Sequence, residues 1–181
     1  MEERDKLVIQ IRDYQTLPEE TDFKEKFLEL LKHPDAFERT HLPGHITGSS
    51  FIISEDFKQT LLVHHAKLNR WLQPGGHADG DTNISRVAMR EANEETGLKH
   101  LTLSSNEIFD IDIHPIPERK DFRAHDHYDI RYLVIGSTEE KIIVSEESHD
   151  VKWVLLSELE KFTQEKSVLR MKEKILLHIH S

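Results

Sequence analysis

The chain has 181 residues, of which 36% are hydrophobic and 32% charged, which is the size and composition of one globular domain. Its 34 acidic and 24 basic residues give a formal net charge of -10, which disfavours binding to nucleic acids and to anionic membranes. The sequence has no Cys, which excludes disulfides, thiolate metal sites and cysteine nucleophiles, and it has no run of about 18 apolar residues that would span a membrane. The charged beginning does not resemble a secretory signal, so we expect a cytoplasmic protein.

The first part of the chain indicates helices. Residues 2–14 and 21–33 show helix-like spacing of apolar residues, and Pro18 and Pro34 break the pattern between and after them. We expect residues 1–43 to form a helical extension packed on the main domain, where it either covers the sheet or mediates a homodimer.

The pattern of residue types changes at Gly44, after which β-branched and apolar residues indicate strands. Residues 45–54 and 59–66 flank the turn-like segment EDFK, which predicts a hairpin. A helix is predicted over residues 83–96, because its apolar residues recur at helical spacing and Gly97 is the residue that a left-handed C-cap prefers.

The last third of the chain predicts more strands and then two helices. The strands are expected within residues 101–114, 126–136, 141–144 and 151–156. Ser157 and Glu160 have capping-box spacing at the start of the first helix, and the second runs towards His178. Because strands and helices do not alternate regularly, we expect an α+β fold with a mixed sheet between helices.

The helix at residues 83–96 places acidic groups where apolar ones are expected. On a helical wheel, Glu91 and Glu95 lie on the apolar stripe and Glu94 lies at its edge. Each like-charge pair costs about 0.2 to 0.5 kcal/mol on an exposed helix and more in a cleft, and the helix dipole adds to the repulsion. Arg90 alone does not neutralise three acids, whereas a hard divalent cation such as Mg²⁺ does.

An ordinary solvated helix face is the alternative interpretation of this acidic cluster, because charge runs are usually solvated. The residues before the helix favour the cation. Gly75 and Gly76 let the backbone approach a ligand closely and expose carbonyl oxygens that can join the carboxylates as ligands.

These residues together resemble a known motif. The segment GHADGDTNISRVAMREANEETGL, residues 76–98, resembles the Nudix box, whose pattern is Gly, five residues, Glu, seven residues, Arg-Glu, an apolar residue, any residue, Glu-Glu, any residue, Gly and an apolar residue. Every spacing fits. The one departure is Thr82, which stands where the pattern has its first Glu. Asp79 and Asp81 could supply the missing charge, or Thr82 could cap the helix.

The resemblance implies a Nudix-like α/β/α sandwich over residues 44–181, with the C-terminal helix as part of the domain. It also implies hydrolysis of a nucleoside diphosphate linked to another moiety, with Mg²⁺, or alternatively Mn²⁺, as the cofactor. Carried over by position, the metal ligands would be the Gly75 carbonyl, Glu91, Glu94 and Glu95, and the catalytic residues would be Arg90, Glu91, Glu94 and Glu147.

The general base stays open at this point. Glu91 is one candidate, and Glu146 and Glu147 in the segment SEESHD are others, because acids of a distant loop serve this role in some family members. We favour Glu147 as base or extra ligand, and the alternative is that the segment is a polar turn.

A second group of polar residues is expected to line a pocket. His125, His127, Asp129 and Arg131 share one face of a predicted strand, because residues two apart point the same way. His125, His127 and also His77, beside the glycines, are expected to bind substrate, with His125 and His127 gripping phosphate or a metal, and Arg131 is expected to bind an anionic group. The alternative is a solvent-facing strand with incidental histidines, since the chain has 13.

The leading functional prediction is therefore a Mg²⁺-dependent pyrophosphohydrolase of the Nudix type that acts on a small-molecule nucleotide diphosphate. The second is a catalytically silent Nudix-fold nucleotide-binding or sensor module, for which Thr82 is the supporting sign. An isoprenoid-diphosphate isomerase ranks last, because that chemistry usually needs a cysteine. ADP-ribose, dinucleoside polyphosphates, coenzyme A, NADH and oxidised nucleoside triphosphates stay open as substrates.

Overall fold

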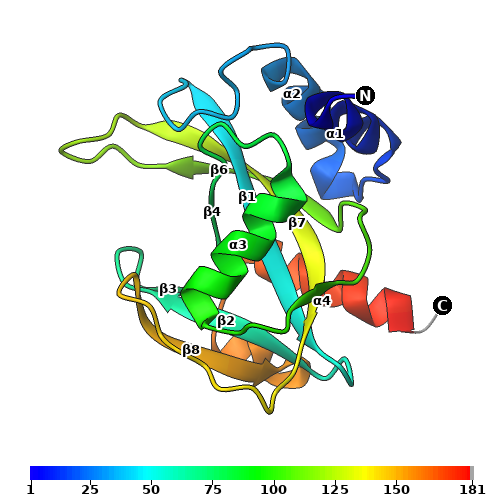
Figure 1. Ribbon diagram of the computed structural model, residues 1–181, viewed down its shortest axis with the longest axis vertical. Helices are drawn as coiled ribbons and strands as arrows, with labels where there is room; N and C mark the ends of the chain where they lie inside the picture. The colour runs from blue at the N-terminus through cyan, green and yellow to red at the C-terminus, as the bar shows by residue number, and fades with distance from the viewer. Residues whose placement is uncertain (180–181) are drawn as a thin grey trace.

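A mixed sheet forms the centre of the molecule (Figure 1). The computed structural model describes residues 1–179, so the last two residues of the predicted domain lie outside the described part. In the middle of the sheet, β1 (Gly44–Ser54) and β7 (His125–Gly136) run parallel along the whole of β1. β2 (Gln59–His65) turns back antiparallel to β1, which confirms the predicted hairpin.

The other strands are antiparallel to their neighbours. β4 pairs with β1, β5 and β6 pair with β7, and β3 and β8 pair with β2. Their bounds are β3 (Arg70–Leu72), β4 (Gly75–His77), β5 (Thr102–Leu103), β6 (Asp110–Ile116) and β8 (Ser148–Leu155). The sheet is therefore mixed, as predicted, but β3 and β4 were not predicted, because three residues are too few to show a period.

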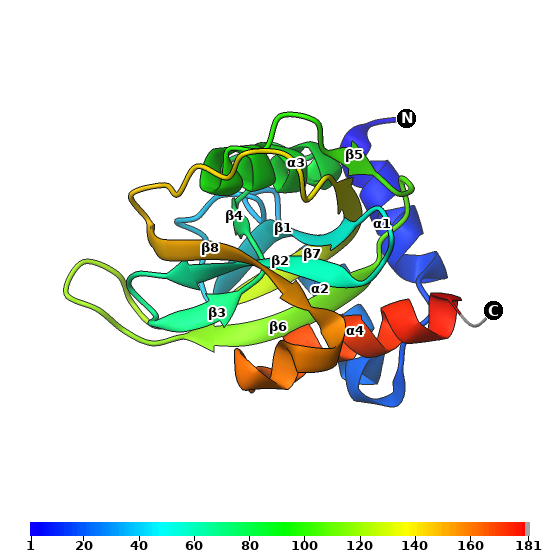
Figure 2. The same cartoon turned by 90° about the horizontal axis from the view of Figure 1, so that it is seen from below.

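Helices cover both faces of the sheet. α3 (Ile84–Thr96) lies on one side and α4 (Lys166–Ile179) on the other, with the sheet between them (Figure 2). These three layers confirm the predicted α/β/α sandwich. Within residues 1–179, no helix is both long enough and apolar enough to cross a bilayer.

The N-terminal helices pack on the same core as the sheet. α1 (Glu3–Asp13) and α2 (Thr21–Leu30), joined through the short 3-10 helix Pro18–Glu20, confirm the two helices expected there. Ile11 and Phe27 are fully buried in one cluster with Ile130 of β7. Full burial of one such side chain stabilises the fold by roughly 1.5 to 3 kcal/mol, so apolar packing holds these helices on the sheet.

Two predicted elements at the end of the domain are wrong. Residues 141–144 are not a strand. The amide of Ile143 instead donates to the carbonyl of Thr96 at 2.8 Å, so this segment completes the end of α3 and its backbone is not available to the sheet. Ser157 does not begin a capped α-helix, because Leu156–Lys161 is a 3-10 helix without a side-chain cap.

Candidate functional site

A cavity of about 910 Å³ opens between α3, the first halves of β1 and β7, β4 and the loop before β8. Carboxylates and imidazoles are prominent among the side chains that line it. Most of the carboxylates come from α3 and from the loop before β8, and the imidazoles come from strands. The box residues and the predicted histidine face thus meet in one cavity, although at least 25 residues separate them in the sequence.

The position of the carboxylates depends on the ends of α3. Asn83 caps its N-terminus by accepting a hydrogen bond from the amide of Arg86 at 3.0 Å, so Thr82 is not the cap. At the other end, Gly97 adopts a left-handed φ of 72°, as the sequence predicts. The helix therefore ends at Thr96, one residue after Glu95.

The three box glutamates differ in burial as the helical wheel predicts. Glu95 is only 6% exposed, Glu91 is half-buried, and Glu94 is exposed at the mouth. Burial raises the pKa of Glu95 to about 8, and the neighbouring Glu91 carboxylate contributes to that rise. The pKa of Glu91 is also raised by burial, even though Arg90 opposes the shift. The cavity thus holds carboxylates that the protein itself does not neutralise.

Arg90 pairs with a glutamate of the box. It donates to Glu91 Oε1 at 2.9 Å and to the carbonyl of His77 at 3.0 Å, which links α3 to β4. Next to it, a Cβ at Gly76 would come within 2.7 Å of Glu91 Oε1 and would displace that carboxylate. The glycine therefore lets the backbone of β4 lie directly against the carboxylate.

Asp79 and Asp81 are already neutralised by arginines. Asp79 accepts a hydrogen bond from Arg39 Nε at 2.6 Å, and Asp81 forms an ion pair with Arg86 at 2.7 Å. In both cases the arginine hydrogen bond is the largest influence on the carboxyl group and lowers its pKa. Neither is thus a free substitute for the carboxylate that Thr82 lacks.

The loop before β8 brings two further acids to the cavity. Glu146 and Glu147 are both exposed and line it. The charge of Glu147 contributes to the raised pKa values of Glu91 and Glu95. A hydrogen bond of 2.9 Å from the amide of Ala66 to the carbonyl of Glu147 ties the loop to the end of β2. The role of Glu147 as general base stays a prediction.

The predicted histidines lie in the cavity together with three that were not assigned to it, His45, His65 and His114. His77, His125 and His127 line it as expected, and His45 and His114 join them. Both flank His127 across the sheet, His45 in the parallel register and His114 in the antiparallel one. Only strand pairing brings them there. Burial is the main reason why the pKa of His77 falls to about 4 and that of His127 to about 2, so both rings are neutral at neutral pH.

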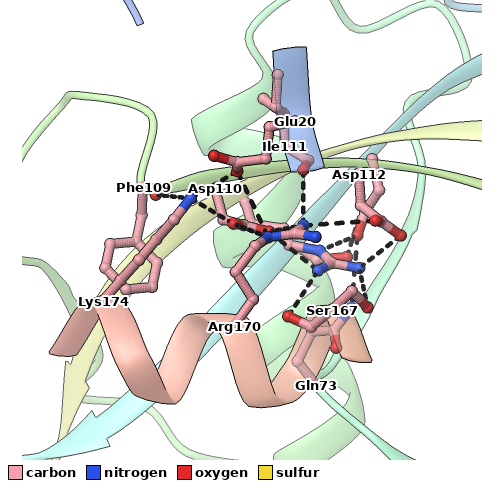
Figure 3. Close-up of polar contacts among 12 residues, drawn as sticks. Glu20, Gln73, Phe109, Asp110, Ile111, Asp112, Ser167, Arg170 and Lys174 are labelled. Atoms are coloured by element: carbon pink, nitrogen blue, oxygen red, sulfur yellow. Dashed lines mark hydrogen bonds and ion pairs between the residues drawn. The ribbon is translucent and has the colours of Figure 1, made fainter. Parts of the chain in front are cut away.

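Arg131 does not line the cavity, and its anionic partners are within the protein. It is 1% exposed and forms ion pairs with Asp129 at 2.7 Å, Asp110 at 3.1 Å and Asp112 at 3.3 Å. We therefore reassign it from substrate binding to a buried charge network. Figure 3 shows Arg170 reaching from α4 into the same network.

The comparison with known families decides the assignment. The model of the NUDIX domain matches residues 44–173. The chain belongs to the Nudix family. This match begins at the first residue of β1 and ends within α4, so it includes the helix and strands that line the cavity, whereas the lining residue Arg39 precedes it.

Relatives of this Nudix protein include hydrolases of several kinds. It is 29% identical over 91 residues to a probable DHNTP pyrophosphohydrolase of Lactococcus lactis subsp. cremoris (strain MG1363), a match that covers 49% of this chain and 52% of that protein. The chain therefore spans about half the length of the curated relative that it matches.

Solved structures show the same fold. A Caenorhabditis elegans Ap4A hydrolase matches with a TM-score of 0.60 and 18% identity over 75% of this chain and 97% of the other. A NUDIX-family hydrolase from Clostridium perfringens matches with a TM-score of 0.55 and 25% identity over 74% and 97%. The Escherichia coli dihydroneopterin triphosphate pyrophosphohydrolase has a TM-score of 0.56 and 16% identity over 74% and 95%.

Proposed function

We propose that this Nudix protein is a Mg²⁺-dependent pyrophosphohydrolase that cleaves a nucleoside diphosphate linked to another moiety. The observation that carries the proposal is the raised pKa of both Glu91 and Glu95 in a cavity of about 910 Å³. Burying carboxylates beside one another destabilises a protein unless a cation neutralises them, and Arg90 forms an ion pair with Glu91.

The residues present fit a hard divalent cation. Mg²⁺ prefers oxygen ligands and is held by a few carboxylates together with substrate phosphates. Glu91, Glu94, Glu95 and the Gly75 carbonyl would hold it here, and Mn²⁺ accepts the same ligands. When bound, the ion would neutralise the diphosphate oxygens and lower the pKa of a water molecule.

The chain's own residues would prepare the reaction around that ion. Arg90 holds the Glu91 carboxylate and, through the His77 carbonyl, fixes its distance from β4. Glu147 would accept the proton of the attacking water, because it lies at the exposed side of the cavity and its charge already reaches both buried glutamates. Glu91 is the second candidate for this role.

The imidazoles would contact the substrate as neutral groups. His77 and His127 have pKa values of about 4 and 2, so at neutral pH they offer one hydrogen-bond donor and one acceptor rather than a positive charge. His125 would act beside them. Such groups position hydroxyls, ring nitrogens and phosphate oxygens without adding charge to the cavity.

One specific observation favours a second candidate function, a nucleotide-binding module without catalysis. Thr82 replaces the first box glutamate, and the two nearby aspartates are committed to arginines. A module of this kind would bind nucleotide diphosphates without turning them over.

A substrate panel distinguishes the two functions. It should contain dihydroneopterin triphosphate and diadenosine tetraphosphate, after the names of the relatives, together with ADP-ribose, coenzyme A, NADH and oxidised nucleoside triphosphates. We expect phosphate or nucleotide release with millimolar Mg²⁺ and none with excess chelator. Turnover that a chelator leaves unchanged would contradict the metal requirement, and binding without turnover across the panel would establish the second candidate.

Variants then test the assigned ligands. Glu95→Gln and Glu91→Gln should each lower kcat by about 10²-fold or more, because each removes a charge that stabilises the transition state through the ion. Glu25→Gln, on the exposed side of α2, is the matched control and should retain full activity.

A further inference from the structure

Six histidines line the cavity, and the rings of five of them contact one another beside the glutamates. These five are His45 of β1, His77 of β4, His114 of β6, and His125 and His127 of β7. Within this group three rings form a tight triangle. The ring centroids of His45, His77 and His127 lie 5.0 to 5.2 Å apart, and one nitrogen from each lies within 4.8 Å of the other two.

His45 carries a buried nitrogen without a partner. His45 is 1% exposed, and its Nε2 makes no hydrogen bond among the described residues. Its Nδ1 lies 3.4 Å from the carbonyl oxygen of His41. A carbonyl oxygen only accepts, so Nδ1 carries the proton and Nε2 keeps a free lone pair. Buried polar atoms normally have a partner, so this lone pair indicates a ligand that binds there.

The same arrangement of hydrogen bonds recurs in two neighbouring histidines. His125 Nδ1 donates to the carbonyl of Arg123 at 2.7 Å, and His114 Nδ1 donates to Asp112 Oδ2 at 3.2 Å. Each is thereby left with an unprotonated Nε2, and that of His125 accepts a hydrogen bond from Nε2 of His127 at 3.3 Å. An imidazole whose other nitrogen donates to a carbonyl or a carboxylate is oriented as metal-binding histidines usually are.

Neither phosphate binding nor ring packing accounts for the cluster as well as a metal ion does. Protonated histidines could grip a phosphate, but adjacent imidazolium rings at these centroid distances would repel one another strongly. Simple ring packing would leave Nε2 of His45 unsatisfied. A cation that accepts several lone pairs satisfies the cluster without either cost.

We propose that His45, His77 and His127 bind a transition-metal dication of the Zn²⁺ class, at a site separate from the glutamates of α3. Imidazole nitrogen suits Zn²⁺, Co²⁺ and Ni²⁺, whereas Mg²⁺ prefers oxygen, so the two ligand sets select different ions. Tetrahedral Zn²⁺ with bonds of about 2.0 to 2.1 Å needs ligand nitrogens about 3.3 Å apart. The three nitrogens lie within 4.8 Å of one another, so ring rotations would bring them to that spacing. His125 is placed to supply a fourth nitrogen. When bound, the ion would take the place of the direct substrate contacts of His77 and His127 described under the proposed function. Its binding does not depend on hydrolytic activity.

Calorimetric titration of the metal-depleted full chain with Zn²⁺ tests the site. The chain should carry no polyhistidine tag, and excess Mg²⁺ should be present to occupy the glutamates. We expect one tightly bound equivalent in the wild type. His127→Ala should weaken binding by about 100-fold or more, since it removes a ligand. Glu91→Gln and the control His100→Ala, whose side chain is 85% exposed, should bind as the wild type does.

Two further measurements protect the test against misfolded variants. Zn²⁺ should raise the thermal midpoint of the wild type but not that of His77→Ala, while circular dichroism shows that this variant is folded. Co²⁺ should give the intense visible absorption of a four-coordinate nitrogen site. The proposal is overturned if the wild type binds no stoichiometric Zn²⁺, if both histidine variants bind it unchanged, or if Glu91→Gln abolishes binding.

Discussion

The protein treats two groups of acids, one on β6 and one on α3, in opposite ways. Asp110 and Asp112 of β6 meet Arg131, while Arg170 and Lys174 reach in from α4 (Figure 3). In the cavity, three glutamates of α3 meet a single arginine of the box. The first group is neutralised from within, whereas the second is not.

The pKa values express this difference. Burial alone would raise the pKa of Asp112, but hydrogen bonding from His114 and the charge of Arg131 outweigh it and lower the pKa to about 2. At Glu95 no cation opposes the effect of burial, and a neighbouring carboxylate adds to it, so the pKa rises to about 8. Burial of an acid therefore does not by itself indicate function. A buried acid that has a cationic partner within the protein is structural, whereas one that lacks such a partner is a candidate metal ligand.

The largest expected effect comes from breaking the neutralised group. Arg131→Met should lower the free energy of unfolding by about 3 to 5 kcal/mol, because it leaves buried aspartates without their shared partner. Urea denaturation measures this loss. The control is Arg86→Ala, which removes an exposed, solvent-screened ion pair with Asp81 and should cost far less. Equal losses in the two variants would show that the network is not held by its charges.

The cavity group should respond in the opposite direction. Without metal, Glu95→Gln should raise the free energy of unfolding at pH 8 by about 1 to 4 kcal/mol. The folded pKa of about 8 lies above the ordinary 4.5, so wild-type stability falls as the pH rises between these values. The variant should lose that slope. Denaturation curves from pH 5 to 9 with chelator check this, and an unchanged slope would contradict the assignment.

The neutralised group should give the opposite pH dependence, in a lower window. The folded pKa of Asp112, about 2, lies below the ordinary 3.8, so its contribution of about 2 kcal/mol is present above pH 3.8 and is lost as the pH falls towards 2. Asp112→Asn should flatten the acid limb of a stability profile while leaving the slope above pH 5 intact. A profile that changes at alkaline pH instead would mean that the two groups are coupled.

The smallest effect is expected from the loop aspartates. Asp79→Ala and Asp81→Ala each remove an arginine ion pair and should change stability by about 0.2 to 1 kcal/mol. We expect the Mg²⁺ concentration for half-maximal activity to stay unchanged, because neither carboxylate is free. A marked increase in either variant would show that the loop does replace the missing box glutamate.

The local sequence determined those features that depend only on residues close together within one helix or strand. The stripe with Glu91 and Glu95, the stop at Gly97 and the polar face with His125 and His127 all follow from periods of 3.6 and 2.0 residues, which need no partner. The box spacing likewise predicted the family that the domain match shows.

Tertiary structure alone decided which groups meet across the chain. His45 and His114 reach His127 through strand register, and Arg131 finds its partners on β6, a strand about 20 residues away in the sequence. Residues 141–144 have strand-like composition, yet their backbone bonds to the end of α3. Such pairings depend on long-range register and on competition for hydrogen bonds, and neither leaves a periodic trace in the sequence.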